Sequence, residues 1–482
     1  MVSESQIIQD LRSIVGIKNV IDEFEDLLVY EQDGSSDAAL PNCVVLPEST
    51  EEVSAVMRYA KNNDIPIIAR GAGTGLSGGA VTEHGGISLV LTRMNKIIEI
   101  DLENQIATVE PGVVNLELSQ KVKENGLFYA PDPASQRACT LGGNIAENSG
   151  GPHCLAYGVT TNHVLGMEVV LSDGTINFVG SRSRDYIGYD LRGIIIGSEG
   201  TLAVVTKIIV KLMRIPEAVK TLLIMFDDET KATDVVSKII STGIVPSALE
   251  MMDRTCVRAA DEAFNLGYPQ DIDAVLIIEV DGLIEEVDED IGLIVNLCKL
   301  YDPLEILTAE TENDRDKLWM ARKSVIGALG RIAPNYLLMD GTVPRTKIGE
   351  AINKTRELSQ NYGLTVANVF HAGDGNLHPC ILFDARKEGD LEKALGIGGE
   401  ILKESVKLGG VLTGEHGVGM EKREFMSLMF DEIDLDNMEK LQFAFGSFGN
   451  LNPGKIFPSN RKNEHPIYDH ASFGTTDFGV IV

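Results

Sequence analysis

Eleven residues near the start of the chain, Arg70 to Ala80, include five glycines. They follow an apolar run, residues 65–69, that predicts a strand. A glycine-rich turn after a strand lets backbone N–H groups surround a phosphate. The glycine spacing of this loop matches the dinucleotide fingerprint. However, the segment between the loop and the next strand is too short for the helix of a Rossmann unit, and that strand ends in Arg93 instead of an acid. We therefore expect a pyrophosphate-binding loop outside the nicotinamide Rossmann fold, with an ordinary surface loop as the alternative.

Charge and cysteine spacing exclude several classes of protein. The 482 residues carry a formal net charge of −30, whereas nucleic acids and anionic membranes attract a cationic face. No apolar run is long enough to cross a bilayer, and the N-terminus lacks the pattern of a signal peptide. The six cysteines show no C-x-x-C spacing, which argues against a bound iron–sulfur cluster. We expect a cytoplasmic protein with reduced thiols, no membrane span and no nucleic-acid partner.

The pattern of predicted elements changes near residue 217. Before it, a first helix is predicted over residues 4–28, and a hairpin with a type I′ turn is predicted around Asp173-Gly174. After it, strands alternate with amphipathic helices, which are predicted near residues 229–242, 284–300, 311–332, 346–361 and 388–408. A chain of this length and changing pattern predicts at least two domains.

Three of the eight histidines lie in two short glycine-rich turns. His371 and His378 flank the first turn, and Glu415 and His416 are adjacent in the second. Two histidines and a carboxylate form a three-ligand metal set with positions left open for substrate. His416, beside the carboxylate, has the chemistry of a general base near neutral pH. Loop histidines with ordinary hydrogen bonds are the alternative, but this gathering of residue types favours a functional site.

Six motifs in order give the chain a family resemblance. They are Arg70–Gly79, Leu141–Asn144, Gly197–Leu202, His371–His378, Gly414–Gly417 and Asn452–Lys455. With them the chain resembles the FAD-dependent 2-hydroxyacid dehydrogenases of the vanillyl-alcohol-oxidase type, which include FAD-linked D-lactate dehydrogenases and the D subunit of glycolate oxidase. The resemblance covers about residues 20–458.

This resemblance implies an α+β fold with the following parts. An FAD-binding domain of two α+β subdomains spans residues 1–217, and a cap domain with a mainly antiparallel sheet flanked by helices spans residues 218–425. A C-terminal segment, residues 426–458, returns to the FAD-binding domain, and residues 459–482 form a tail.

The resemblance also implies where FAD binds. The first two glycine loops hold the pyrophosphate, and the loop of Glu199 lies near the flavin. FAD is expected to be non-covalent, because the first loop lacks the histidine to which some relatives attach it. The expected FAD-site residues are Arg70, Gly71, Ala72, Gly73, Thr74, Gly75, Leu76, Ser77, Gly78, Pro131, Asp132, Ser135, Thr140, Gly142, Gly143, Asn144, Ser149, Gly150, Gly151, Glu199, Val204 and Asn452.

The catalytic residues implied by the resemblance extend the two histidine turns. His371, His378 and Glu415 are expected to bind a divalent metal (zinc, iron or manganese). His416 takes the substrate hydroxyl proton while hydride moves from C2 to flavin N5. The guanidinium of Arg322 matches a substrate carboxylate, although an amphipathic surface helix would explain this arginine equally well. Asn376 and Lys455 are further candidates by position, and Lys455 could equally be a solvated turn residue.

The predicted reaction is FAD-dependent oxidation of a small D-2-hydroxy acid, D-lactate first, to the 2-oxo acid. Electrons then pass to a partner such as an electron-transfer flavoprotein; alternatively the chain is the catalytic subunit of a glycolate oxidase with an iron–sulfur subunit. A non-redox transferase resembling alkyl-glycerone-phosphate synthase is disfavoured by the histidine turn. A non-catalytic FAD-binding scaffold has no need of that turn. Direct oxidation by O₂ stays open, and D-lactate and glycolate differ by only one methyl group.

Overall fold

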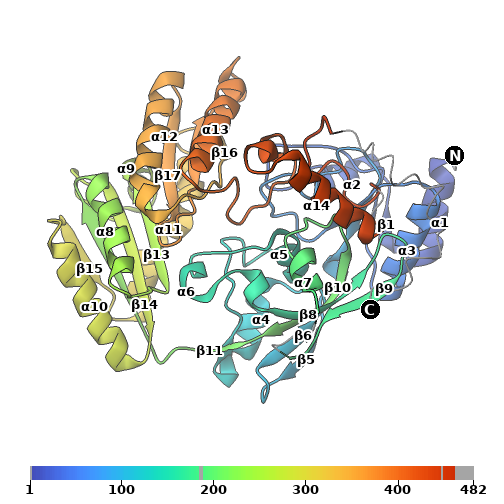
Figure 1. Ribbon diagram of the computed structural model, residues 1–482, viewed down its shortest axis with the longest axis horizontal. Coiled ribbons are helices and arrows are strands. Elements are labelled where there is room, and N and C mark those ends of the chain that lie inside the picture. Colours follow the sequence, from blue (N-terminus) through green and yellow to red (C-terminus); the bar gives the residue numbers. More distant parts are fainter. Residues whose placement is uncertain (1–2, 184–187, 447–448, 462–482) are drawn as a thin grey trace.

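The computed structural model describes residues 3–183, 188–446 and 449–461. Most of the predicted tail, from residue 462 onward, lies outside the described residues. Figure 1 shows strands β1–β11 on one side of the molecule and strands β12–β18 on the other. Helix α14 (Glu432–Ala444) lies over the first side. The chain after it also contacts that side, because Leu451 forms a parallel bridge with Ile67 of β3 and Asn452 donates its backbone N–H to the carbonyl of Ile67.

The first sheet has four strands in the order β1-β2-β4-β3, with β2, β4 and β3 parallel. Its strands are β1 (Val20–Ile21), β2 (Cys43–Val45), β3 (Ile67–Arg70) and β4 (Ile87–Val90). Helices α1 (Glu4–Val15) and α3 (Thr50–Asn62) share its apolar core. The helix predicted over residues 4–28 was therefore too long. It ends at Val15 because Gly16 takes a φ of +89°, outside the helical region.

The second sheet has five antiparallel strands in the order β5-β6-β10-β8-β9. They are β5 (Ile97–Asp101), β6 (Ile106–Val109), β8 (Val164–Val170), β9 (Ile176–Gly180) and β10 (Val204–Lys211). Helices α4 (Asn115–Val122), α5 (Leu141–Glu147) and α7 (Leu191–Ile195) pack beside it, and β7 (Leu127–Phe128) pairs with β11 (Met213–Arg214). The predicted β8–β9 hairpin is confirmed, but its type I′ turn is wrong. Only Gly174 has a positive φ (+82°), and Leu171 and Thr175 close a longer turn.

The last sheet has seven antiparallel strands, ordered β15-β12-β14-β13-β17-β18-β16. The strands are β12 (Ala218–Phe226), β13 (Ala248–Asp253), β14 (Ala274–Gly282), β15 (Glu305–Thr308), β16 (Asn335–Leu338), β17 (Thr365–His371) and β18 (Pro379–Phe383). Its helices are α8 (Glu229–Ser241), α9 (Arg254–Phe264), α10 (Ile284–Lys299), α11 (Glu312–Leu329), α12 (Ile348–Tyr362) and α13 (Asp390–Lys407). Alternate residues of β12 pack against α8 and α10 on one face and α9 and α11 on the other. The predicted α+β fold with an antiparallel, helix-flanked sheet is confirmed.

A buried ion network joins the two sides of the molecule. His153, just before α6 (Cys154–Tyr157), lies with Nδ1 2.7 Å from Asp132 Oδ2 and Nε2 3.1 Å from Glu279 Oε1 on β14. Arg315 of α11 donates to both oxygens of Glu279. Burial opposes the charged imidazole, but Asp132 and Glu279 outweigh it and raise the pKa of His153 to about 10. The imidazolium therefore links the two sides at neutral pH.

This link gives a pH-dependent prediction for stability. Because the pKa of His153 is about 10 when folded and about 6.5 when unfolded, its stabilisation is complete below the lower value. This stabilisation is lost as the pH rises from the unfolded pKa toward the folded pKa, by up to about 1.4 kcal/mol per pH unit. We expect the difference in free energy of unfolding between the wild type and His153→Gln to shrink across this range. Urea unfolding at several pH values measures it, and a constant difference would contradict the assignment.

Candidate active site

A cavity runs from the first glycine loop to the turn that carries Glu415 and His416. It brings together residues that are more than 300 positions apart in the sequence. Most of the predicted FAD-site residues line it, namely Arg70, Gly71, Ala72, Gly73, Thr74, Gly75, Leu76, Ser135, Thr140, Gly142, Gly143, Asn144, Ser149, Glu199 and Val204.

The first glycine loop meets the chemical requirement of an anion-binding loop. Between Ala72 and Gly79, within the described chain, no backbone N–H donates a hydrogen bond. Unpaired amides at the wall of a cavity are open to a phosphate or to water. A Cβ on Gly71 would collide with Thr140 Oγ1, and one on Gly142 would lie 2.6 Å from Pro111 Cβ. The close approach of the two loops therefore requires glycine, and the residues present fit a dinucleotide such as FAD.

Two buried carboxyl groups lie at the wall of this cavity. Glu199 has a left-handed backbone (φ +53°), and its carboxylate accepts the N–H groups of Val418 (2.6 Å) and Gly419 (2.7 Å). Glu147, at the end of α5, faces the same turn, since a Cβ on Gly417 would meet both carboxyl groups. Burial and then the charge of Glu199 raise the pKa of Glu147 well above its usual value. Glu199 thus joins the third glycine loop to the turn after His416.

The three predicted metal ligands converge at the other end of the cavity. Glu415 Oε1 lies 3.2 Å from Nε2 of His371 and 3.2 Å from Nε2 of His378. His371 ends β17 and His378 precedes β18, so the tight turn between these strands brings the two rings to 5.0 Å. Burial opposes ionisation of Glu415, but the two imidazoles outweigh it and lower its pKa. The set has the residue types and the spacing that a divalent metal requires.

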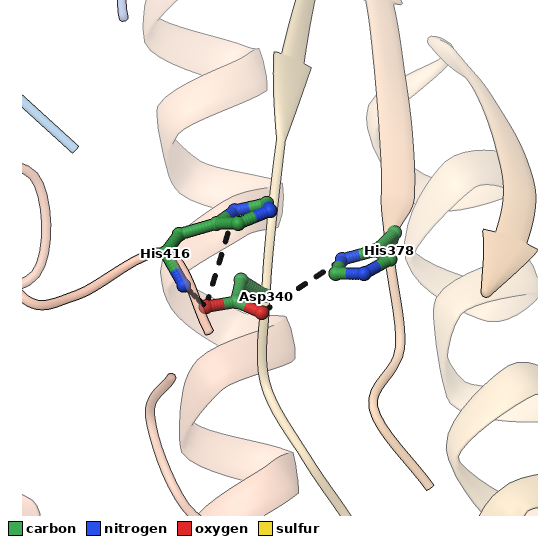
Figure 2. Close-up of side chains that lie close together, drawn as sticks. All are labelled: Asp340, His378 and His416. Atoms are coloured by element: carbon green, nitrogen blue, oxygen red, sulfur yellow. Dashed lines mark hydrogen bonds and ion pairs between the residues drawn. The ribbon is translucent and has the colours of Figure 1, made fainter. Parts of the chain in front are cut away.

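Figure 2 shows Asp340 between His378 of the first turn and His416 of the second. Asp340 Oδ2 accepts hydrogen bonds from the Thr413 hydroxyl and from the backbone N–H groups of Gly414 (3.1 Å) and His416 (2.9 Å). Its two oxygens lie 3.8 Å from His378 Nδ1 and 3.9 Å from His416 Nδ1. The two imidazoles stack with an interplanar angle of 8°. With Nδ1 toward Asp340, each histidine keeps Nε2 for chemistry.

His416 is the histidine that lines the cavity. Burial lowers its pKa to about 4, although the charge of Asp340 opposes this shift. Its imidazole is therefore neutral near pH 7, which is the state that can accept a proton.

Two family models match the chain. A family described as "FAD linked oxidases, C-terminal domain" matches residues 215–456, and one described as "FAD binding domain" matches residues 41–180. The chain belongs to the FAD-linked oxidases. The family resemblance inferred from the six motifs is thereby confirmed.

Curated relatives of this FAD-linked oxidase match it over nearly their whole length. "Glycolate oxidase subunit GlcD" of Escherichia coli strain K12 is 42% identical, covering 95% of this chain and 92% of the relative. The protein of the same name from Bacillus subtilis strain 168 is 39% identical, covering 94% and 97%. "D-lactate dehydrogenase" of Anaerostipes hadrus is 32% identical, covering 95% and 97%.

Solved structures share the fold of this FAD-linked oxidase at low identity. p-Cresol methylhydroxylase is 19% identical with a TM-score of 0.80, covering 95% of this chain and 98% of that one. Alkyldihydroxyacetonephosphate synthase is 18% identical with a TM-score of 0.71, covering 93% and 84%. In the described part of the chain, no helix has the length and apolar character needed to cross a membrane.

Some predicted FAD-site residues lie outside the lining of the cavity. They are Ser77, Gly78, Pro131, Asp132, Gly150, Gly151 and Asn452. Several brace it instead: Ser77 donates its hydroxyl to the carbonyl of His416, and Asn452 donates its amide to the carbonyls of Gly79 and Glu199. Asp132 is the partner of His153. Ser77 and Asn452 thus support the loops, and contact of these seven residues with FAD stays a prediction.

The remaining predicted catalytic residues, Arg322, Asn376 and Lys455, lie at different distances from the histidine turns. Arg322, on α11, donates Nε–H to Glu250 at 2.7 Å. Asn376 packs against Gly414, between the two histidine turns. Lys455 donates its ammonium to the carbonyl of Val81 and is absent from the described lining of the cavity. Arg322 and Asn376 are absent from that lining too. Lys455 is buried instead of solvated, and burial lowers its pKa to about 8, although the charge of Glu83 opposes this shift. Its catalytic role stays a prediction.

Sequence reasoning missed Asp340 and Glu250, which contact the predicted ligands. Glu250 is buried on β13, where it accepts hydrogen bonds from Arg322 and His371. The sequence feature that could have identified Glu250 is a single acidic residue inside the apolar run Ala248–Met252. The corresponding feature of Asp340 is a single acidic residue directly before a glycine at a strand end. A single charged residue in an apolar strand needs a buried partner.

Proposed function

We propose that this FAD-linked oxidase oxidises a small 2-hydroxy acid, with D-lactate as the first candidate, to the 2-oxo acid. The observation that carries the proposal is the single cavity lined by the FAD-type glycine loops at one end and by Glu415 and His416 at the other. Relatives named D-lactate dehydrogenase and glycolate oxidase subunit support oxidation of hydroxy acids as the reaction class.

Each residue at the site has a proposed role. Non-covalent FAD, bound along the glycine loops, supplies the hydride acceptor, flavin N5. Zinc, iron or manganese, held by His371, His378 and Glu415, would lower the pKa of the substrate hydroxyl. His416 accepts the hydroxyl proton at Nε2, and Asp340 lies 3.9 Å from Nδ1 on the opposite side of its ring. The unpaired end of the Arg322 guanidinium binds the substrate carboxylate.

We further propose that the chain divides as its sequence indicates. An FAD-binding domain spans residues 1–217, a cap domain spans residues 218–425, and residues 426–458 return to the first. The electrons leave to an acceptor protein in the cytoplasm, an electron-transfer flavoprotein first. The charge of −30 suits docking onto a basic partner.

A second candidate is the catalytic subunit of a glycolate oxidase that works with an iron–sulfur subunit. The identity of 42% to a GlcD subunit, against 32% to a D-lactate dehydrogenase, favours it.

An anaerobic visible spectrum tests both candidates. The FAD-loaded protein is mixed in parallel with D-lactate, L-lactate, glycolate and D-2-hydroxyglutarate. We expect the flavin absorbance to bleach with D-lactate or glycolate, and the faster of the two identifies the substrate. Flavin that none of the four acids bleaches, in protein loaded with zinc or manganese, would contradict the proposal.

A further inference from the structure

Glu250 joins two groups to which the proposed function gives different parts of the substrate, the hydroxyl and the carboxylate. One carboxylate oxygen lies 2.7 Å from Nδ1 of His371, and the other lies 2.7 Å from Nε of Arg322. The Glu250 side chain is 1% exposed, so neither bond competes with water. His371 ends β17, which pairs with β13, and Arg322 comes from α11.

Each of these bonds occupies one nitrogen of its partner. Because Nδ1–H of His371 donates to Glu250, Nε2, which lies 3.2 Å from Glu415 Oε1, is the nitrogen available to a metal. Arg322 donates Nε–H to Glu250, and its two terminal nitrogens have no hydrogen-bond partner among the described residues. They are also not among the fully buried unpaired atoms, and the Arg322 side chain is 12% exposed, so each keeps some contact with solvent.

We propose that Glu250 is a positioning residue that fixes the tautomer of His371 and the orientation of Arg322 together. A single buried carboxylate thereby sets the spacing between the metal, which would hold the substrate hydroxyl, and the guanidinium, which would hold the substrate carboxylate. This inference rests on the proposed function, because the roles of both partners do.

The substitution Glu250→Gln separates this role from simple packing. Both neighbours donate an N–H to Glu250, and glutamine offers one acceptor oxygen and one NH₂ donor in the same shape. If the NH₂ faces His371, the imidazole must move its proton to Nε2 and can no longer bind a metal. If the NH₂ faces Arg322, two hydrogen-bond donors oppose each other and the guanidinium turns away. In either case the glutamine keeps its hydrogen bond to only one of the two neighbours in the required form.

The chain offers a matched control in Glu279 on the neighbouring strand β14. It is also 1% exposed and is also bonded to one histidine and one arginine of α11, His153 and Arg315. Glu279 also accepts hydrogen bonds from Thr221 and Trp319. Glu279→Gln therefore removes a similarly buried carboxylate charge outside the metal-ligand set. We expect it to keep the zinc affinity of the wild type.

The test measures zinc affinity and steady-state kinetics of the FAD-loaded variants. Zinc is titrated against a chromophoric chelator, and KM is measured with D-lactate and glycolate and a dye as electron acceptor. For Glu250→Gln we expect about 10- to 100-fold weaker zinc binding or a KM raised about tenfold or more. Glu250→Asp keeps both acceptor oxygens and should recover part of the loss. If packing alone mattered, the smaller aspartate would be worse than the isosteric glutamine, and that order would overturn the inference.

A measurement on the wild type covers the case in which Glu250→Gln does not fold. With zinc bound, the Nδ1–H proton of His371 should give a downfield proton resonance that is missing from His371→Gln. Absence of that resonance would overturn the inference. A wild type that binds no zinc refutes the metal site of the proposed function, and this inference with it. A wild type that binds zinc no better than folded Glu250→Gln, with the same KM, refutes this inference alone.

Discussion

Replacing His416 with alanine is expected to leave FAD bound and to slow flavin reduction by the 2-hydroxy acid about 10²- to 10⁴-fold. The reason is the position of the imidazole. It lines the cavity, stacks on the proposed metal ligand His378 and has Asp340 beside Nδ1, which leaves Nε2 for a substrate proton. The FAD-type glycine loops lie elsewhere along the cavity, so the affinity for FAD should not change.

Stopped-flow absorbance under anaerobic conditions measures this effect. The flavin spectrum before mixing reports FAD content, and the rate of bleaching after mixing reports the chemical step. His84→Ala is a suitable control, because the His84 side chain is 54% exposed. A His416→Ala protein that bleaches at the wild-type rate would remove His416 from the role of base.

Replacing Glu415 with glutamine is expected to have an effect of similar size through the metal. Glu415 supplies the one negative charge among the three proposed ligands, and its Oε1 is equidistant from both histidine nitrogens. Glutamine keeps the shape and loses the charge, and a divalent cation depends strongly on that charge. We expect zinc or manganese affinity to fall about a hundredfold or more and flavin reduction to fall with it.

Metal content after gel filtration and anaerobic reduction rates give the two readouts. Glu424→Gln controls for the loss of one carboxylate in the same segment, because the Glu424 side chain is 51% exposed. Full metal content in Glu415→Gln would show that the ligand set is wrong. Full activity after complete removal of metal by a chelator would show that the reaction does not use one.

Local patterns allowed much of the site to be predicted. His371 and His378 share one turn, and Glu415 and His416 share another, so residue type and spacing alone marked both. Glu250 was missed because its connection to His371 spans 121 residues and exists only through the pairing of β13 with β17. Asp340 was missed for the same reason, since it reaches the 413–416 turn across 73 or more residues. Contacts across a sheet are not encoded in neighbouring residues.

In the fold too, elements that depend on nearby residues were predicted, whereas those that depend on pairing with distant residues were not. The five helices predicted after residue 217 are confirmed to within a few residues, and all of them except α11 show a clear amphipathic period along their own length. The amphipathic helix α9 was missed. The helix predicted to residue 28 failed where periodic apolar residues continued into a strand, Val20–Ile21, which forms only by pairing with β2. Strand order in the seven-stranded sheet likewise depends on distant pairings, and its antiparallel character came from the family resemblance.

The pairing of β3 with residues near 451 has a consequence for the order of events during synthesis. Ile67 exchanges backbone hydrogen bonds with Asn450 and Asn452, and Asn452 also holds Gly79 and Glu199. The first glycine loop is therefore braced by residues that leave the ribosome almost 400 positions later. The nascent N-terminal half lacks this support, and we expect FAD to bind tightly only after this last segment is translated.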